Sequence, residues 1–277
     1  MKTDTKTLEE KINRAREIIR KTGGCVVAYS GGVDSTLVLE LAVSELNGRV
    51  IAVIAESPAY PKRERTHALH WVQSRGIPYR VIKSYELKNV NFRQNPPERC
   101  YYCKKELFSQ MLEVAKEAGY NYVIDGTNAD DEGDWRPGIK AASELGIISP
   151  LKEAGLRKPE IREACRRHVN AEIANKPSMA CLASRFPYGE EINEHKLSMI
   201  EKIEDFLSSE GFSNFRARYH QTVLRIEVPA DEIGRLIEEP LRSELIGLAR
   251  ECGFRYVTAD LEGFQSGSMN RLLEKDT

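Results

Sequence analysis

The 277-residue sequence lacks the features of a membrane, secreted or nucleic-acid-binding protein. No apolar run approaches the roughly 18 residues that a membrane-spanning helix needs. Residues 1–21 are polar and charged, without the apolar stretch of a secretory signal peptide. The 41 basic and 42 acidic residues nearly cancel, so no overall positive charge attracts nucleic acid. We therefore expect a cytoplasmic protein without a membrane or nucleic-acid partner.

The sequence also has little cysteine, and internal repeats and low-complexity segments are missing. Six cysteines in a cytoplasmic chain do not indicate a disulfide framework. Cys25 opens an apolar run, and Cys165 and Cys252 lie on or near predicted helices, so we expect structural roles for these three. The others lie in loop-like stretches of unusual composition: Cys100, Cys103 and Cys181.

Hydropathy patterns predict an α/β fold with a doubly wound parallel sheet, followed by a small α+β domain. Apolar strands alternate with helices in the first 170 or so residues, which is typical of a parallel sheet covered on both faces. The strands are predicted at 25–30, 49–57, 79–84 and 122–127, and the helices at 7–20, 35–46, 61–75, 104–118 and 158–168. Later elements are predicted as a helix at 193–210, strands at 215–220 and 223–229, a helix at 230–251 and a strand at 254–261.

Three regions follow from this pattern. Residues 1–176 are predicted to form a nucleotide-binding domain. Residues 177–191 contain two prolines and a glycine with little periodicity, and we interpret them as a junction loop. Residues 192–277 are predicted to form the α+β domain.

The segment "AYSGGVDST" at 28–36 has the composition of a pyrophosphate-binding loop. Its two glycines let the backbone approach an anion, and the following helix directs its N-terminal N–H groups at the same point. Asp34 would repel phosphate unless a cation bridges them, so it predicts Mg²⁺. The alternative is an ordinary glycine turn with Asp34 as a helix cap. The expected contacts are Ala28, Ser30, Gly31, Gly32, Asp34, Ser35 and Thr36.

The loop is not a Walker or dinucleotide motif, because the sequence has neither GxxxxGK[ST] nor GxGxxG at this point. A second stretch, "DGTNADDEGDWRPG" at 125–138, follows the fourth predicted strand. The carboxyl ends of parallel strands line the ligand crevice, so Asp125, Gly126 and Thr127 are expected to face the nucleotide. Arg136 is expected to anchor this loop or to contact phosphate.

The segment "SGGVDS" resembles the SGGxDS motif of the PP-loop ATP pyrophosphatases, which cleave ATP to AMP and pyrophosphate while adenylating an oxygen of their substrate. The segments "RPGIKAASELG", "CLASRFPYG" and "TADLEGFQSGSMN" resemble the ATP-dependent sulfur transferases that build the nickel-pincer nucleotide cofactor of lactate racemase. This resemblance spans nearly the whole chain. It implies that a pyridinium carboxylate mononucleotide is activated by AMP and becomes a thiocarboxylate, in a homo-oligomer such as a hexamer.

The resemblance also implies that the domain at 192–277 binds substrate and forms the oligomer, and it implies roles for single residues of the C-terminal half. Ser184 and Arg185 would contact the substrate or the AMP phosphate. Arg216 and Arg218 lie two apart on a predicted strand and share a face, which suits a phosphate of the mononucleotide. The alternative is an exposed basic strand balanced by a nearby carboxylate. Two further positions are associated with a metal ion: Glu204 and Glu227.

Some members of this family sacrifice a cysteine as their sulfur source, and the matching position here is Ala180, beside Cys181. Other members hold a 4Fe-4S cluster with three cysteines, and Cys100, Cys103 and Cys181 fit that arrangement. Three thiolates leave one iron open for an extra sulfide, whereas clusters held by four cysteines have none. The resemblance thus gives catalytic roles to Asp34, Cys181, Ser184 and Arg185.

Other interpretations remain open. Zinc would need a fourth ligand, which His195 or His168 could supply, and a redox pair would favour Cys103 near a helix N-terminus. A tRNA thiolase of the same superfamily predicts a strongly basic face or an added RNA-binding module. An ammonia-dependent amidotransferase would not need the three cysteines, and an AMP-binding scaffold would need no chemistry at all.

Overall fold

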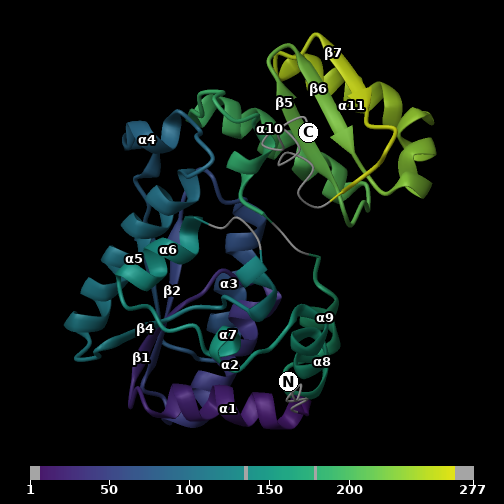
Figure 1. The fold of residues 1–277 in the computed structure, drawn as a ribbon. Helices are drawn as coiled ribbons and strands as arrows, with labels where there is room; N and C mark the ends of the chain where they lie inside the picture. Colours follow the sequence, from purple (N-terminus) through teal and green to yellow (C-terminus); the bar gives the residue numbers. More distant parts are fainter. Residues whose placement is uncertain (1–6, 134–136, 178–179, 266–277) are drawn as a thin grey trace. The chain divides into compact units, whose positions relative to one another are not determined.

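The computed structural model describes residues 7–133, 137–177 and 180–265, and these divide into two units (Figure 1). Of the described residues, the first unit comprises 7–57, 62–86, 98–133 and 137–177. The second comprises 58–61, 87–97 and the chain from 180 onward. Backbone bonds attach the two short segments to the second unit: Leu182 N donates to Ala59 O at 2.7 Å, and Ile192 N donates to Arg93 O at 2.8 Å. The sequence pattern did not predict these attachments.

A four-stranded parallel sheet with the order β3-β2-β1-β4 lies at the centre of the first unit, as predicted. Its strands are β1 (Cys25–Ala28), β2 (Val50–Glu56), β3 (Tyr79–Lys83) and β4 (Tyr122–Ile124). Val26 of β1 is level with Ile51 of β2 and with Val123 of β4. The chain therefore reverses its direction of winding between β1 and β4, and the crevice of such a sheet lies at the carboxyl ends of these two strands.

Helices cover both faces of this sheet because neighbouring residues of a strand point to opposite faces. Val27 and Ile54 pack with the helices of one face, and Val26 and Val53 pack with those of the other. The first face is covered by α1 (Leu8–Arg20), α2 (Val33–Leu46), α3 (Lys62–Ser74), α7 (Pro150–Glu153), α8 (Lys158–His168) and α9 (Ala171–Asn175). The second is covered by α5 (Arg99–Glu117) and α6 (Pro137–Glu144). The predicted doubly wound α/β fold is confirmed.

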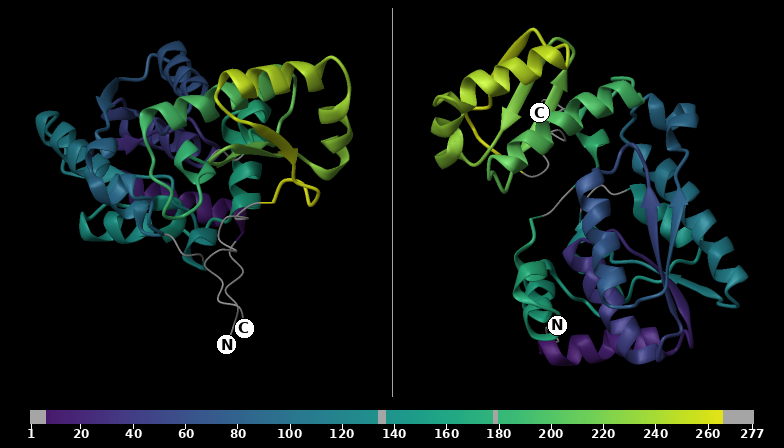
Figure 2. Two further views of the ribbon diagram at one scale, coloured as in Figure 1. Left: turned by 90° about the horizontal axis from the view of Figure 1, so that it is seen from above. Right: turned by 180° about the vertical axis from the view of Figure 1, so that it is seen from behind.

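The second unit holds a separate three-stranded sheet with the order β5-β6-β7 (Figure 2). β5 (Arg216–His220) and β6 (Val223–Glu227) are antiparallel, and β6 is parallel to β7 (Tyr256–Ala259). Helix α10 (Glu194–Ser209) packs on β5 and against α11 (Leu241–Glu251). The remaining short elements of the two units are η1 (Glu86–Lys88), α4 (Val90–Arg93), η2 (Ala129–Gly133), η3 (Leu182–Arg185) and η4 (Ala230–Ile237).

Two predicted helices differ from the structure. The helix expected at 104–118 begins at Arg99, so the paired cysteines lie in its first turn and not in a loop. The helix expected at 230–251 is divided into the 3-10 helix η4 and α11. Pro240 explains the division, because proline has no N–H to donate within a continuous helix. Among the described residues, no helix is long and apolar enough to cross a membrane.

Candidate functional site

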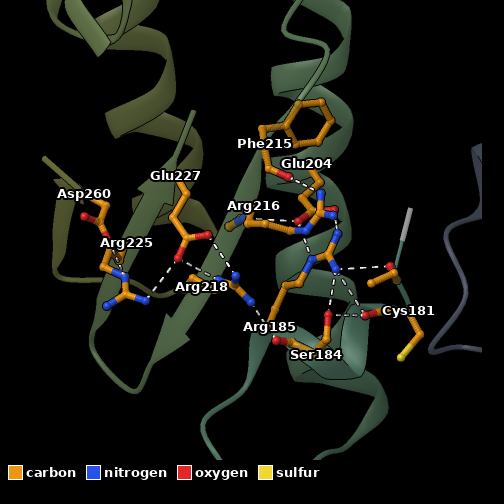
Figure 3. Close-up of polar contacts among 12 residues, drawn as sticks. Cys181, Ser184, Arg185, Glu204, Phe215, Arg216, Arg218, Arg225, Glu227 and Asp260 are labelled. Atoms are coloured by element: carbon orange, nitrogen blue, oxygen red, sulfur yellow. Dashed lines mark hydrogen bonds and ion pairs between the residues drawn. The ribbon is translucent and has the colours of Figure 1, made fainter. Parts of the chain in front are cut away.

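Two groups of residues match the predicted site, one in each unit. The first lies at the carboxyl ends of β1 and β4 and at the N-terminus of α2, and we call it the nucleotide cradle. The second is a cluster of arginines and carboxylates around η3, α10 and the β5–β6 pair, and we call it the charged cluster (Figure 3). The two groups are described separately.

The nucleotide cradle depends on two glycines that allow close backbone contacts. Gly31 has a φ of +68°, and a Cβ there would lie 2.9 Å from the Cβ of Ala68. A Cβ on Gly126 would lie 2.8 Å from the backbone N of Ser35, at the start of α2. No side chain fits at such a distance. The turn after β4 therefore lies directly against the first turn of α2, and the structure brings together the two stretches that the sequence marked separately.

Hydroxyl groups bind the loop to the start of the helix. Ser30 Oγ lies 3.1 Å from Ser35 Oγ, and Ser35 Oγ donates to Gly32 O at 3.2 Å. Thr36 Oγ1 donates to Gly32 O at 2.8 Å, and the residue is fully buried. The Thr36 hydroxyl thus holds the loop against the first turn of the helix. The phosphate contact predicted for Thr36 stays a prediction. Ala28 ends strand β1.

Asp34 lies on the first turn of α2, and the two oxygens of its carboxylate differ in their contacts. Lys158 Nζ forms an ion pair with Oδ2 at 2.5 Å. Oδ1 is buried and has no hydrogen-bond partner among the described residues. A buried carboxylate oxygen without a donor is unfavourable unless a ligand supplies a partner. Oxygen is also the ligand that Mg²⁺ prefers, so the donor set here fits the predicted cation.

A second lysine holds the loop. Lys176 Nζ donates to the backbone O of Gly31 at 2.9 Å and forms an ion pair with Glu64 at 2.8 Å. The Lys176 and Glu64 side chains are only 16% and 8% exposed, so this contact is well shielded from solvent. Sequence analysis identified neither Lys158 nor Lys176. No motif marks them, and both lie more than a hundred residues from the loop that they contact.

Asp125 organises the turn after β4. Its Oδ1 accepts from Thr127 N at 3.1 Å and from Ser149 Oγ at 2.7 Å, and its Oδ2 accepts from Thr127 Oγ1 at 2.6 Å. Asp125 is itself buried. Ser149, which the sequence did not indicate, therefore completes the turn. Arg136 lies outside the described residues, so its role stays a prediction.

The six cysteines divide into two classes, and none of them forms a disulfide bond. Cys25, Cys165 and Cys252 are buried, and burial raises the pKa of their thiols, to about 12 for Cys25 and Cys165, as expected for structural residues. The three candidate ligands are instead partly exposed: Cys100, Cys103 and Cys181.

Cys100 and Cys103 share one side of the first turn of α5, whereas Cys181 precedes η3 in the second unit. Within residues 7–133, 137–177 and 180–265, no group of three or more His, Cys, Asp or Glu side chains could hold a metal ion. The cluster ligand set stays a prediction.

Arg185 holds the turn that carries Cys181 (Figure 3). Its Nε and Nη2 donate to the two oxygens of Glu204 at 2.7 and 2.9 Å. Its Nη1 donates to the backbone O of Ala180 at 3.1 Å, to that of Cys181 at 3.2 Å and to Ser184 Oγ at 2.8 Å. Arg185 is fully buried, and these bonds hold the backbone of the Cys181 turn in place. The contact with substrate or the AMP phosphate predicted for Ser184 and Arg185 stays a prediction.

Glu204 is also fully buried. Burial raises its pKa, but the charge and hydrogen bonds of Arg185 and the backbone N–H of Ala217 outweigh that effect and hold the pKa below its ordinary value. Its oxygens accept from these donors in the structure. The metal role predicted for Glu204 is untested.

The predicted arginine pair on β5 lies in the interior. Arg218 donates to both oxygens of Glu227 at 2.9 and 2.8 Å and to the backbone O of Ser184 at 2.8 Å. Arg225 reaches the same carboxylate at 3.1 Å. Both Arg216 and Arg218 are more than nine-tenths buried, so the alternative of an exposed basic strand is wrong. The metal role predicted for Glu227 stays a prediction.

Arg216 lies in an environment that disfavours its charge. Its guanidinium lies 4.8 Å from the ring centre of Phe264, and its Nη1 donates to Phe215 O at 2.6 Å. Burial, reinforced by the positive charge of Arg185, lowers its pKa to about 10. The charged cluster contains four guanidinium groups (Arg185, Arg216, Arg218, Arg225) against three carboxylates (Glu204, Glu227, Asp260). Each of these carboxylates is ion-paired with at least one of the guanidinium groups.

Comparison with known proteins shows which family the chain belongs to. The NAD synthase family profile matches residues 2–105, which include the loop of the nucleotide cradle. An uncharacterized protein of Synechocystis sp. is 41% identical over 97% of this chain and 100% of its own length. The pyridinium-3,5-bisthiocarboxylic acid mononucleotide synthase of Lactiplantibacillus plantarum is 36% identical over 90% of both chains. A glutamine-hydrolysing GMP synthase polypeptide from Archaeoglobus fulgidus is 30% identical over 58% of this chain and 55% of its own.

Proposed function

The chain is an enzyme of the PP-loop ATP pyrophosphatase family, in the branch that includes the pyridinium-3,5-bisthiocarboxylic acid mononucleotide synthase, and we propose that it converts the carboxylates of a pyridinium-3,5-biscarboxylic acid mononucleotide to thiocarboxylates. The observation that carries this proposal is the extent of the likeness. It covers nine-tenths of both chains, and so includes the nucleotide cradle and the Cys181–Arg185 turn.

The first half-reaction would take place at the nucleotide cradle. A carboxylate oxygen of the substrate attacks the α-phosphorus of ATP, and pyrophosphate leaves with the electron pair of the broken P–O bond. The N-terminus of α2 and the glycine loop after β1 would bind the phosphates, because unpaired N–H groups and the helix dipole favour negative charge there. Asp34 would hold Mg²⁺, which neutralises phosphate charge when bound.

In the second half-reaction, a sulfur nucleophile attacks the acyl carbon and AMP leaves with the former carboxylate oxygen. Cys100, Cys103 and Cys181 would hold a 4Fe-4S cluster, which would supply the transferred sulfide when bound. Arg185 would fix the backbone of Cys181 through the carbonyls of Ala180 and Cys181. The position that a sacrificial cysteine would need is occupied by Ala180.

The charged cluster would bind the phosphate of the mononucleotide. Arg216 and Arg218 lie two apart on β5 and share a face, and arginine matches phosphate in geometry and charge. We also propose that the enzyme works as a homo-oligomer such as a hexamer, which light scattering of the purified protein would test.

The amide-forming class is the second candidate, because the NAD synthase profile matches residues 2–105 and the GMP synthase polypeptide matches 58% of the chain. An amidotransferase would adenylate its substrate at the same cradle and then use ammonia. Cys181 separates the two functions, since only sulfur transfer needs its thiol.

The experiment compares wild type with Cys181→Ser, both purified without oxygen. Iron and acid-labile sulfide are assayed first, then AMP release and thiocarboxylate formation with the mononucleotide and sulfide. We expect four irons per chain and thiocarboxylate from wild type, and neither from Cys181→Ser. Cys252→Ser is the matched control and should behave as wild type. An amide formed from ammonia by both wild type and Cys181→Ser would instead establish the amidotransferase.

A further inference from the structure

We propose that Lys158 is an exchangeable counter-ion: it neutralises Asp34 while the nucleotide cradle is empty, and moves to the phosphate oxygens when Mg²⁺ and nucleotide bind. This inference deepens the proposed function, since it rests on nucleotide binding at the cradle. It assigns a role to a residue that no sequence motif indicates.

The contact itself is specific but accessible. Lys158 and Asp34 are 124 residues apart in the chain, and their side chains are 29% and 24% exposed. The ammonium contacts only Oδ2, while Oδ1 is buried without a partner among the described residues. One lysine therefore neutralises the charge of Asp34 without meeting its full hydrogen-bonding capacity. A hard cation that prefers oxygen ligands would be attracted to the remaining oxygen.

The backbone of Lys158 is anchored although its side chain is not enclosed. Lys158 is the first residue of α8, and its N–H donates to Asp130 Oδ2 at 2.8 Å. The helix is fixed to the core of the first unit by Ile161, and Cys165 Sγ contacts Val33 O at 3.6 Å. A fixed Cα with a flexible four-carbon stem lets the ammonium change partners within the cradle without moving the helix.

Electrostatics then drives the exchange. A divalent cation on Asp34 repels the ammonium that shares the carboxylate, and partly exposed ion pairs are weak enough to be replaced. The phosphates of the nucleotide arrive with several negative oxygens, which offer the ammonium a new partner within reach. Lys176 makes the contrasting case. Its side chain is enclosed and bound to both Glu64 and Gly31 O, so it stays with the loop.

The test measures two affinities of the intact protein. Mn²⁺ binding without nucleotide is followed by electron paramagnetic resonance, and binding of a non-hydrolysable ATP analogue with Mg²⁺ is followed by calorimetry. In Lys158→Met we expect Mn²⁺ to bind about tenfold more tightly and the analogue about tenfold more weakly. The opposite signs identify the exchange, because general damage to the site would weaken both. Asp34→Asn should abolish Mn²⁺ binding and thereby locate the ion.

Lys176→Met is the matched control. It should weaken the analogue while leaving Mn²⁺ affinity unchanged, since its ammonium does not contact Asp34. Lys158→Gln serves the same test should the Met variant fail to fold. A Mn²⁺ affinity that is unchanged or reduced in the Lys158 variant would overturn the inference. Wild-type protein that binds no ATP analogue would overturn the proposed function instead, so the two failures are distinguishable.

Discussion

The nucleotide cradle and the charged cluster differ in whether their polar groups have partners within the protein. The cradle is built from backbone, small hydroxyls and the carboxylates of Asp34 and Asp125, and Asp34 Oδ1 has no partner among the described residues. In the charged cluster, guanidinium groups and buried carboxylates bind one another closely, as in the Arg185–Glu204 pair. An oxygen of the cradle is thus left for a ligand, whereas the buried charges of the cluster are paired with one another.

Breaking the buried pair should have the largest effect. Glu204→Gln leaves the enclosed Arg185 guanidinium without its counter-charge, and we expect a loss of about 3–5 kcal/mol in the free energy of unfolding. Urea unfolding of the purified protein measures it. Glu163→Gln on α8, whose partners Arg166 and Arg167 are exposed, is the control and should leave stability unchanged. A Glu204→Gln variant as stable as wild type would show that the charged cluster does not depend on internal pairing.

The activity of the nucleotide cradle should depend on close backbone packing, whereas the stability of the charged cluster depends on the pairing of charges. In Gly126→Ala, the added methyl group would lie 2.8 Å from Ser35 N and push the β4 turn from α2. We expect ATP–pyrophosphate exchange to fall about 100-fold, because small misplacements of reacting groups are costly. Gly247→Ala, which has open space around it, is the matched control and should retain full exchange. Full exchange in Gly126→Ala would remove the cradle from the reaction.

The smallest effect should appear in the pH dependence of the free energy of unfolding, through His220 beside the charged cluster. Burial, aided by the charges of Arg225 and Arg218, lowers the pKa of His220, whose Nε2 has no partner among the described residues. The neutral form is therefore favoured in the folded state, and the unfolded chain binds the proton more readily. Stability should be fully present above the unfolded pKa near 6.5 and decline as the pH falls toward the folded pKa, by no more than about 1.4 kcal/mol per pH unit.

His220→Gln should flatten this slope between neutral and mildly acidic pH, as measured by urea unfolding at several pH values. The exposed His195→Gln serves as control. An unaltered slope in His220→Gln would assign the pH dependence to other groups.

Much of the fold and of the cradle could be predicted from the sequence. Apolar runs alternating with helical periodicity depend on local spacing, so the parallel sheet and its helices were visible without coordinates. The glycines and Asp34 were visible for the same reason, since a phosphate loop is a continuous segment. The start of α5 at Arg99 was not, because the "ERCYYCKK" segment lacks an apolar repeat that would indicate a helix.

The strands of the parallel sheet, the phosphate loop and the cysteine spacing all depend on neighbours along the chain, and the amino-acid order alone was enough to specify them. Which charges meet depends instead on the folded arrangement: Lys158 with Asp34, Lys176 with Gly31, and Arg185 with Glu204. That arrangement also places the Arg185 guanidinium on the backbone carbonyls of Ala180 and Cys181. The physical reason is burial, since a charge removed from water requires a partner, and the fold determines which distant residue supplies it.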